Sequence, residues 1–182
     1  MNDAQASRVE VVPGNLLTAD VDAIVNPANE QLHNDGGLAK DISEAAGPEF
    51  EADCRRLAPV PTGSAKVSVA GNLPQRAVIN AVGPIWQGGS HDEARLLAAT
   101  HSAIVRVASE ARLRRVALPA ISTGIFHYPP EQAAPVAIGA TLQALTEYPT
   151  VDLVRFVMYT KDPNKAAVYQ SALTAALGGA GA

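Results

Sequence analysis

The apolar run Asp22-Ala23-Ile24-Val25-Asn26 leads into a polar loop, and this loop ends in Gly36-Gly37-Leu38-Ala39. The run predicts a β-strand, and the residues after the two glycines predict a helix. Main-chain N–H groups in the first turn of a helix have no partner within the helix, and the helix dipole makes that end electropositive. The order strand, loop, glycine-marked helix therefore predicts a site for a phosphorylated ligand.

The remainder of the chain alternates between strand and helix patterns. Short β-branched runs predict strands at 9–12, 23–26, 65–70, 77–82, 116–119 and 153–159. Intervening segments predict helices at 38–46, 48–57, 92–111, 130–147 and 164–177, with Ser90 and Glu93 as a capping box at the start of the longest. Such alternation is typical of an α/β fold in which helices cover both faces of a largely parallel sheet.

The size and composition are those of one globular domain. The chain has 182 residues, of which 47% are hydrophobic and 18% charged. This predicts a single domain over 8–177, with flexible tails at 1–7 and 178–182. No apolar run approaches the roughly 18 residues that span a bilayer, and the N-terminus shows no secretory pattern, so we expect a cytoplasmic location and no membrane partner.

Charge and cysteine content exclude several classes of protein. The net charge is −4, which argues against a nucleic-acid partner, and the basic segment Arg112-Leu113-Arg114-Arg115 is interpreted as a solvated connection. The lone cysteine, Cys54, excludes an intrachain disulfide and is interpreted as a buried structural thiol. The histidines show no metal-ligand spacing, so we expect no metal and no cofactor. His101 is interpreted as a packed boundary residue with one hydrogen bond.

Three polar, glycine-bearing or small-residue loops follow predicted strands, at 26–37, 121–126 and 160–163. Ligands of open α/β sheets bind beyond the carboxyl ends of strands, so the loops predict one shared cleft. Ser122, Thr123 and Gly124 are small enough for a ligand to approach the main chain, whose N–H groups can form an anion-binding nest. Phe126 offers an apolar face to a sugar; the alternative is a tight turn with Phe126 in the core.

Two common nucleotide-binding patterns are missing from the sequence. It contains no G-x-x-x-x-G-K-[ST] segment, which argues against a P-loop NTPase. It contains no G-x-G-x-x-G segment between a strand and a helix, which argues against a hydride-transferring Rossmann enzyme.

From about Val11 to Leu177 the chain resembles the macrodomain family. The resemblance rests on ordered motifs: Gly14-Asn15-Leu16, Val21-Asp22-Ala23-Ile24-Val25-Asn26-Pro27-Ala28-Asn29, Gly36-Gly37-Leu38-Ala39, Pro61-Thr62-Gly63-Ser64-Ala65, Val82-Gly83-Pro84 and Pro119-Ala120-Ile121-Ser122-Thr123-Gly124-Ile125-Phe126. The Asn…Gly-Gly-Leu-Ala pattern is most similar to microbial macrodomains and to those attached to some poly-ADP-ribose polymerases. The resemblance implies a three-layer α/β/α sandwich with a mixed, mostly parallel sheet of about six strands.

The resemblance also implies that the chain binds ADP-ribose. Asn15 occupies the position of an Asp that accepts from the adenine amino group, and an Asn could accept through its oxygen without the charge. Tyr159 matches the aromatic residue beside adenine, and Asn29 matches the residue that binds the distal ribose. The residues implied to bind ADP-ribose are Asn15, Leu16, Ala28, Asn29, Gly36, Gly37, Leu38, Ser122, Thr123, Gly124, Ile125, Phe126 and Tyr159.

Catalysis is a separate question, because two residues used by hydrolytic members of the family are replaced. Ala39 stands where one subgroup has an Asp, and Asn34 stands where others have a His. Asn29 and Asp35 are the candidate catalytic residues, with Asp35 orienting or activating water. The alternatives are that Asn34 or Asp35 only caps the following helix, or that the bound diphosphate itself positions the water.

Two functions remain open. The first is a metal-independent hydrolase that removes mono-ADP-ribose from acidic side chains or deacetylates O-acetyl-ADP-ribose. The second is a non-catalytic reader of ADP-ribose. The expected partners are ADP-ribose and ADP-ribosylated proteins.

Overall fold

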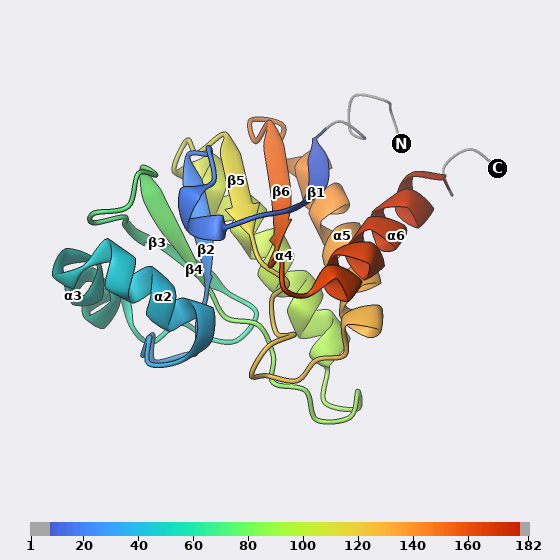
Figure 1. Cartoon of the computed structure of the whole chain (residues 1–182), viewed down its shortest axis with the longest axis horizontal. Helices are drawn as coiled ribbons and strands as arrows, with labels where there is room; N and C mark the ends of the chain where they lie inside the picture. The colour runs from blue at the N-terminus through green and yellow to red at the C-terminus, as the bar shows by residue number, and fades with distance from the viewer. Residues whose placement is uncertain (1–7, 179–182) are drawn as a thin grey trace.

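The computed structural model describes residues 8–178 and contains one six-stranded sheet (Figure 1). Its strands are β1 (Val9–Pro13), β2 (Ala23–Pro27), β3 (Ala65–Val69), β4 (Ala77–Ala81), β5 (Arg115–Leu118) and β6 (Leu153–Met158). They lie in the order β1-β6-β5-β2-β4-β3, and every neighbouring pair is parallel except β3 with β4. The predicted mixed, mostly parallel sheet is confirmed.

Helices cover both faces of this sheet. They are the 3₁₀-helix η1 (Leu16–Thr18) and the α-helices α2 (Gly37–Ala46), α3 (Pro48–Leu57), α4 (Glu93–Glu110), α5 (Pro130–Glu147) and α6 (Pro163–Gly178). Helices α2 and α3 pack with η1 on one face, and α4, α5 and α6 pack on the other (Figure 1). The three-layer α/β/α sandwich is confirmed.

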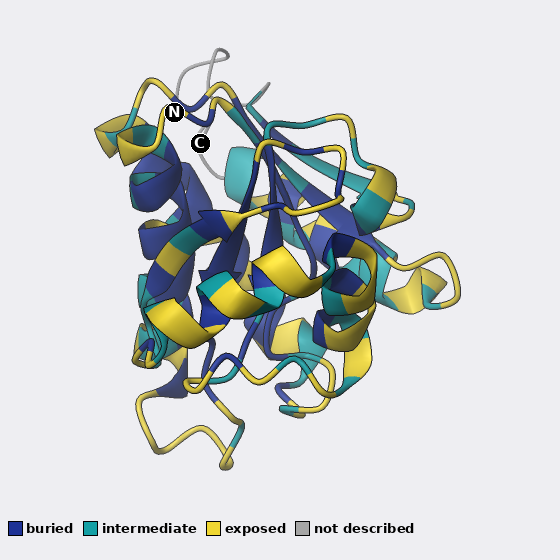
Figure 2. Cartoon of the chain, turned by 90° about the vertical axis from the view of Figure 1, so that its left-hand side faces the viewer, coloured by how far each residue is buried: buried dark blue, intermediate teal, exposed yellow. Residues whose placement is uncertain are grey.

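The central strands explain why the sequence reads as continuous apolar runs. Every residue of β4, and all of β2 except Pro27, is buried (Figure 2). On β2, Ala23 and Val25 belong to the core beneath α4–α6, whereas Ile24 belongs to the core beneath α2 and α3. Successive side chains point to opposite faces, so a sheet covered on both sides needs apolar residues at nearly every position.

The predicted bounds of strands and helices agree with the structure to within one residue. Strand β6 ends at Met158, so Tyr159 begins the loop that follows. Gly178, predicted to belong to the C-terminal tail, instead ends α6, because the Ala- and Leu-rich run before it continues the helix. The other predicted tail residues, 1–7 and 179–182, lie outside the described residues.

The predicted capping box at the start of α4 is wrong. The N-cap is Asp92, in a left-handed conformation with φ of 59° and no side-chain cap bond. The buried Glu93 carboxylate instead accepts the main-chain N–H groups of Gln87, Gly89 and His91, at 2.9, 3.1 and 2.7 Å. Burial alone would raise the pKa of Glu93, but these donors lower it to about 2. Glu93 therefore holds the loop before α4 in place and does not form a capping box with Ser90.

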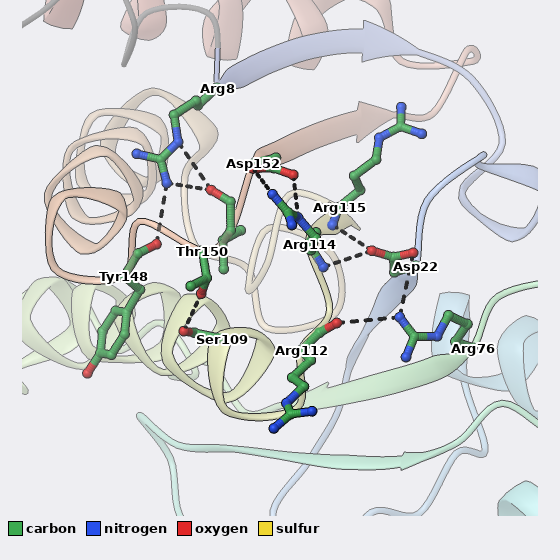
Figure 3. Close-up of polar contacts among 11 residues, drawn as sticks. Arg8, Asp22, Arg76, Ser109, Arg112, Arg114, Arg115, Tyr148, Thr150 and Asp152 are labelled. Carbon is green, nitrogen blue, oxygen red and sulfur yellow. Dashed lines mark hydrogen bonds and ion pairs between the residues drawn. The ribbon is translucent and has the colours of Figure 1, made fainter.

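The basic segment 112–115 lies at the amino end of the sheet, where Figure 3 shows it among acidic partners. The exposed Arg114 guanidinium donates to Asp152 at 2.7 and 3.2 Å. The Asp22 carboxylate accepts the main-chain N–H groups of Arg114 and Arg115 at 2.7 and 3.0 Å. These contacts tie the starts of β2, β5 and β6 together, in agreement with a solvated structural connection.

Two findings on partners concern residues 8–178 alone. No helix in this range is long and apolar enough to cross a bilayer. In the same range, no group of three or more His, Cys, Asp or Glu side chains is placed to hold a metal ion. The expected cytoplasmic location stays a prediction.

His101 lies deeper than predicted. It is 1% exposed on α4, and its Nδ1–H donates to the Leu97 carbonyl at 2.8 Å, while Nε2 has no partner within the described residues. Its ring stacks on Phe156 of β6, with 6.1 Å between ring centroids. Burial lowers the pKa of His101 to about 4. The folded protein therefore holds this imidazole neutral.

We predict that the free energy of unfolding falls by about 2 kcal/mol between pH 7.5 and pH 5 because of His101. The unfolded state binds a proton below its pKa of about 6.5, whereas the folded state does not until about pH 4. Urea unfolding across this range measures the slope. His101→Phe should remove it, and His91→Phe, at an exposed position, should keep it. A wild-type stability that stays flat across the range contradicts the prediction.

Candidate functional site

A cavity of about 1120 Å³ lies at the carboxyl ends of β2, β5 and β6. These strands are parallel, so the loops that follow them meet at one edge of the sheet. The cavity is slightly larger than most small-molecule sites, whose volumes are about 300–1000 Å³. Its lining includes Asp35 and every residue predicted to bind the ligand: Asn15, Leu16, Ala28, Asn29, Gly36, Gly37, Leu38, Ser122, Thr123, Gly124, Ile125, Phe126 and Tyr159. Their grouping is observed, and their roles stay predictions.

The start of α2 forms one wall of the cavity. Gly36 is the N-cap and makes no side-chain cap bond, and Gly37 has φ of +57°, a left-handed conformation that favours glycine. A Cβ atom at either glycine would meet nothing within 4 Å, so this stretch of main chain is open. The N–H groups of Leu38 and Ala39 belong to the first helical turn and have no intrahelical acceptor. This wall is therefore electropositive without a basic side chain.

The loop after β5 forms the facing wall. Tyr128 N–H donates to the Ser122 carbonyl at 2.9 Å, and His127 N–H donates to the Gly124 carbonyl at 3.0 Å, which folds the loop into a compact turn. Within residues 8–178, the N–H groups of Gly124, Ile125 and Phe126 donate no hydrogen bond. Consecutive free N–H groups in such a turn form a nest for an anion. Phe126 is half-buried and lines the cavity, so the alternative that placed it in the core is wrong.

A partly buried hydrogen-bond network holds the first wall. Asn26 of β2 donates through Nδ2 to Asn34 Oδ1 at 2.9 Å and to Asn80 Oδ1 of β4 at 3.0 Å. Asn34 in turn donates through Nδ2 to the Glu51 carboxylate of α3 at 3.0 Å. The alternative that Asn34 or Asp35 caps α2 is wrong, because the Asn34 carboxamide is engaged with these interior partners and Gly36 occupies the N-cap.

Cys54 belongs to the same network and lies outside the cavity lining. Its Sγ accepts from Asn34 Nδ2 at 3.7 Å and donates to Asn80 Oδ1 at 3.8 Å. Burial raises the pKa of the Cys54 thiol to about 11. A neutral, buried thiol is a poor nucleophile, so the interpretation as a structural residue is confirmed.

Asn29 organises the turn that begins the first loop. Its Oδ1 accepts the main-chain N–H of His33 at 2.9 Å, and its Nδ2 donates to the His33 carbonyl at 3.0 Å. One N–H and one oxygen lone pair of this carboxamide remain for a ligand. The turn fixes the Asn29 side chain at the cavity before any ligand arrives.

Asp35 is the carboxylate nearest in sequence to the glycine pair. It is exposed, lines the cavity, and makes no hydrogen bond or ion pair to another described residue. Ala39 lines the same wall but offers only a methyl group. Asp35 is therefore free to hold or activate a water molecule.

Asn15 and Tyr159 lie together at another part of the cavity. Gly14 N–H donates to the Met158 carbonyl at 3.0 Å. This bond places Asn15, the residue after Gly14, beside Tyr159, the residue after Met158. Tyr159 is 63% exposed, so its ring is available to a ligand. Asn15 Oδ1 accepts the main-chain N–H of Leu17 at 3.0 Å and caps η1.

Three charged residues of the cavity were not predicted from the sequence: Asp41, Glu44 and Lys165. His33 and Thr160 also line it, and the sequence predicted them only as members of the loops 26–37 and 160–163. Asp41 and Ala45 follow Leu38 at helical spacing, so the predicted helix at 38–46 did carry a signal for them. Lys165 lies in the first turn of α6, and nothing in the sequence shows that this turn faces the cavity.

A second loop, 83–93, supports the wall after β5 from behind. Trp86 N–H donates to the Phe126 carbonyl at 2.9 Å, and the Trp86 ring contacts Tyr128 with 4.6 Å between centroids. A Cβ atom at Gly83 would lie 2.2 Å from Ser122 Oγ and 2.6 Å from Ile121 Cγ2, so the two loops touch at this glycine. Glu93 holds the far end of this supporting loop through the three bonds described above.

Comparisons with known proteins agree on one family. The Macro domain model matches residues 25–137. An O-acetyl-ADP-ribose deacetylase of Klebsiella pneumoniae is 40% identical over 172 residues, which are 92% of this chain and 97% of that protein. A mutant macrodomain of Oceanobacillus iheyensis solved with ADPR is 30% identical, with a TM-score of 0.87 and coverage of 94% of this chain and 95% of that one. A Trypanosoma brucei macrodomain in complex with ADP-ribose is 26% identical, with a TM-score of 0.83 and coverage of 93% and 72%.

The chain belongs to the macrodomain family. The family resemblance drawn from the ordered motifs is therefore confirmed.

We predict that Gly83→Ala destabilises the fold by about 1–3 kcal/mol, because the new methyl group overlaps Ser122 and Ile121. Gly139→Ala is the matched control: its Cβ meets nothing within 4 Å in α5, and it should stabilise the helix by about 0.5–1 kcal/mol. Urea unfolding compares the two. Equal stability of Gly83→Ala and the wild type would show that the loops are not in close contact.

Proposed function

We propose that this chain binds ADP-ribose in the cavity and hydrolyses the ester of O-acetyl-ADP-ribose. The observation that carries the proposal is the pair of facing walls of free main-chain N–H groups, one at the start of α2 and one at 124–126. A pyrophosphate is the part of ADP-ribose that such walls suit, because it carries the negative charge. Relatives about 40% identical over most of the chain are named O-acetyl-ADP-ribose deacetylase.

With the pyrophosphate between the walls, the two ends of the ligand extend in opposite directions. The base lies against Tyr159 and Asn15, beside the ends of β6 and β1. The distal ribose lies between the Asn29 carboxamide and the apolar face of Phe126, both of which line the cavity. The free N–H and lone pair of Asn29 bind ribose hydroxyls.

Ester hydrolysis needs a water molecule beside the distal ribose. Asp35 takes a proton from the water as its oxygen attacks the acetyl carbonyl carbon. The bond from that carbon to the ribose oxygen breaks, and the ribose oxygen takes the proton from Asp35, which leaves acetate and ADP-ribose. The same water could attack the anomeric carbon of a mono-ADP-ribosylated Glu or Asp and release the carboxylate. Both reactions share one binding mode, so the partners are the free nucleotide sugar and mono-ADP-ribosylated proteins.

A non-catalytic reader is the second candidate, and Ala39 favours it. The side chain at this position lines the cavity but carries no functional group. Incubation with O-acetyl-ADP-ribose, with acetate release followed over time, separates the two functions. If calorimetry shows binding of ADP-ribose and no acetate is released, the hydrolase is excluded and the non-catalytic reader is supported. Failure to bind at millimolar concentration would refute both.

We predict that Asp35→Ala lowers the turnover number for O-acetyl-ADP-ribose by about 100-fold or more, the usual effect of losing a general base. Affinity for ADP-ribose should change only a few-fold, because Asp35 does not hold the pyrophosphate. Asp20→Ala is the control, since Asp20 is a fully exposed carboxylate outside the cavity lining. Unchanged turnover in Asp35→Ala would favour water positioned by the diphosphate alone.

We predict that Gly124→Glu weakens ADP-ribose binding at least 100-fold. A Cβ atom at Gly124 would meet nothing within 4 Å, so we expect the fold to accept the substitution, whereas the carboxylate repels the pyrophosphate. Gly139→Glu, at an exposed position of α5, adds the same charge outside the cavity. Calorimetry measures both affinities. Retention of affinity within a few-fold in Gly124→Glu would show that the pyrophosphate lies elsewhere.

A further inference from the structure

The side chain of Asn34 points into the protein, although both of its neighbours in the chain line the cavity. His33 and Asp35 are exposed and belong to the cavity lining, whereas Asn34 is half-buried and lies outside it. The Asn34 carboxamide accepts from Asn26 Nδ2 at 2.9 Å and donates to Glu51 Oε1 at 3.0 Å. Asn34 therefore attaches this loop to β2 on one side and to α3 on the other.

Glu51 sets the direction of these hydrogen bonds. An ionised carboxylate only accepts, so Asn34 turns its NH₂ group toward Glu51 and its oxygen toward the NH₂ group of Asn26. The same Glu51 oxygen, Oε1, also accepts from the hydroxyl of Ser43 on α2. Glu51 thus joins three segments: α3, on which it lies, α2, and the loop before α2.

Asp35 depends on this attachment because its own side chain has none. In the part of the chain that the structure describes, its carboxylate accepts no hydrogen bond and forms no ion pair. The next two residues are Gly36 and Gly37, which have no side chain to pack and allow the main chain more freedom than other residues do. Leu38 is the first residue after Asp35 whose side chain packs against a core cluster. The last side-chain anchor before Asp35 is therefore Asn34.

Reaction and binding place different demands on this wall. A general base works only when it is held in line with the water and the carbon that the water attacks, and a small displacement costs rate. The proposed grip on the pyrophosphate instead uses main-chain N–H groups at the start of α2 and at 124–126. Neither Asn34 nor Glu51 lines the cavity. Loss of their bond should therefore slow the reaction more than it weakens binding.

Building on the proposed function, which supplies the reaction, we propose that Asn34 and Glu51 are positioning residues that act as one unit. Their hydrogen bond holds the main chain before Asp35, so that the Asp35 carboxylate stays at the attacking water. Glu51 acts in this unit as a hydrogen-bond acceptor and not through its charge. A glutamine at position 51 can replace it, because an amide oxygen also has two lone pairs, one for Asn34 and one for Ser43.

A double-mutant cycle tests the proposal, with acetate release from O-acetyl-ADP-ribose as the measure of turnover and calorimetry as the measure of ADP-ribose affinity. Asn34→Ala and Glu51→Ala should each lower the turnover number at least about tenfold and change the dissociation constant less than about fivefold. The double variant should be no slower than the slower single variant within about threefold, because both substitutions remove the same bond.

Two further variants serve as controls. Glu51→Gln keeps the acceptor and should retain the wild-type turnover number within about threefold. Glu49→Ala removes a carboxylate from an exposed position of the same helix and should leave turnover and affinity unchanged. Binding of ADP-ribose by each variant shows that it is folded.

The outcomes separate this inference from the proposed function. With an active wild type, the inference alone is overturned by full turnover in either alanine variant, by additive losses in the double variant, or by a loss of affinity as large as the loss of turnover. A slow Glu51→Gln variant that still binds ADP-ribose also overturns it, since charge would then matter. A wild type that releases no acetate overturns the proposed hydrolysis and this inference with it.

Discussion

The buried carboxamide of Asn26 donates to the oxygens of Asn34 and Asn80, and the geometry of the ligand-binding edge depends on these two bonds. Asn26 is on β2, in the interior of the sheet, so its position is fixed by packing on both faces. The bond to Asn34 transfers that rigidity to the loop before α2. Burying the Asn26 NH₂ group would be costly without these two acceptors, so the pair of bonds favours one conformation of the loop, although Asn26 Oδ1 has no partner within the described residues.

The other wall of the cavity, formed by the loop after β5, is held rigid by different contacts. Loop 83–93 supports it through the Trp86 bond to Phe126 and the close contact of Gly83 with Ser122, and Glu93 holds the supporting loop. Both walls then expose main-chain N–H groups rather than basic side chains. An acidic protein can therefore offer a site for a pyrophosphate, because helix ends and nests supply the positive potential locally.

The sheet and its helices were predictable because their signals are local or strictly periodic. β-branched runs such as 23–26 and 153–158 mark strands, and their continuous apolar character indicates burial on both faces. The residues of the cavity were predictable as a group for a related reason, since parallel strands place their following loops at one edge. Capping was not predictable: Ser90 and Glu93 have the right spacing for a box, yet Glu93 bonds to Gln87, Gly89 and His91 instead.

The order of amino acids alone specified the layers of this macrodomain, the edge of the sheet that carries the cavity, and the glycines that open its main chain. Folding was needed to assign the partners of polar side chains. Asn34 donates to Glu51, Asn15 accepts from Leu17, and Lys165 lines the cavity. The spacing of residues in the sequence predicts none of these three contacts. The physical reason is that a donor or acceptor bonds to whichever group tertiary packing places about 3 Å away, and segments distant in the chain supply most of those groups.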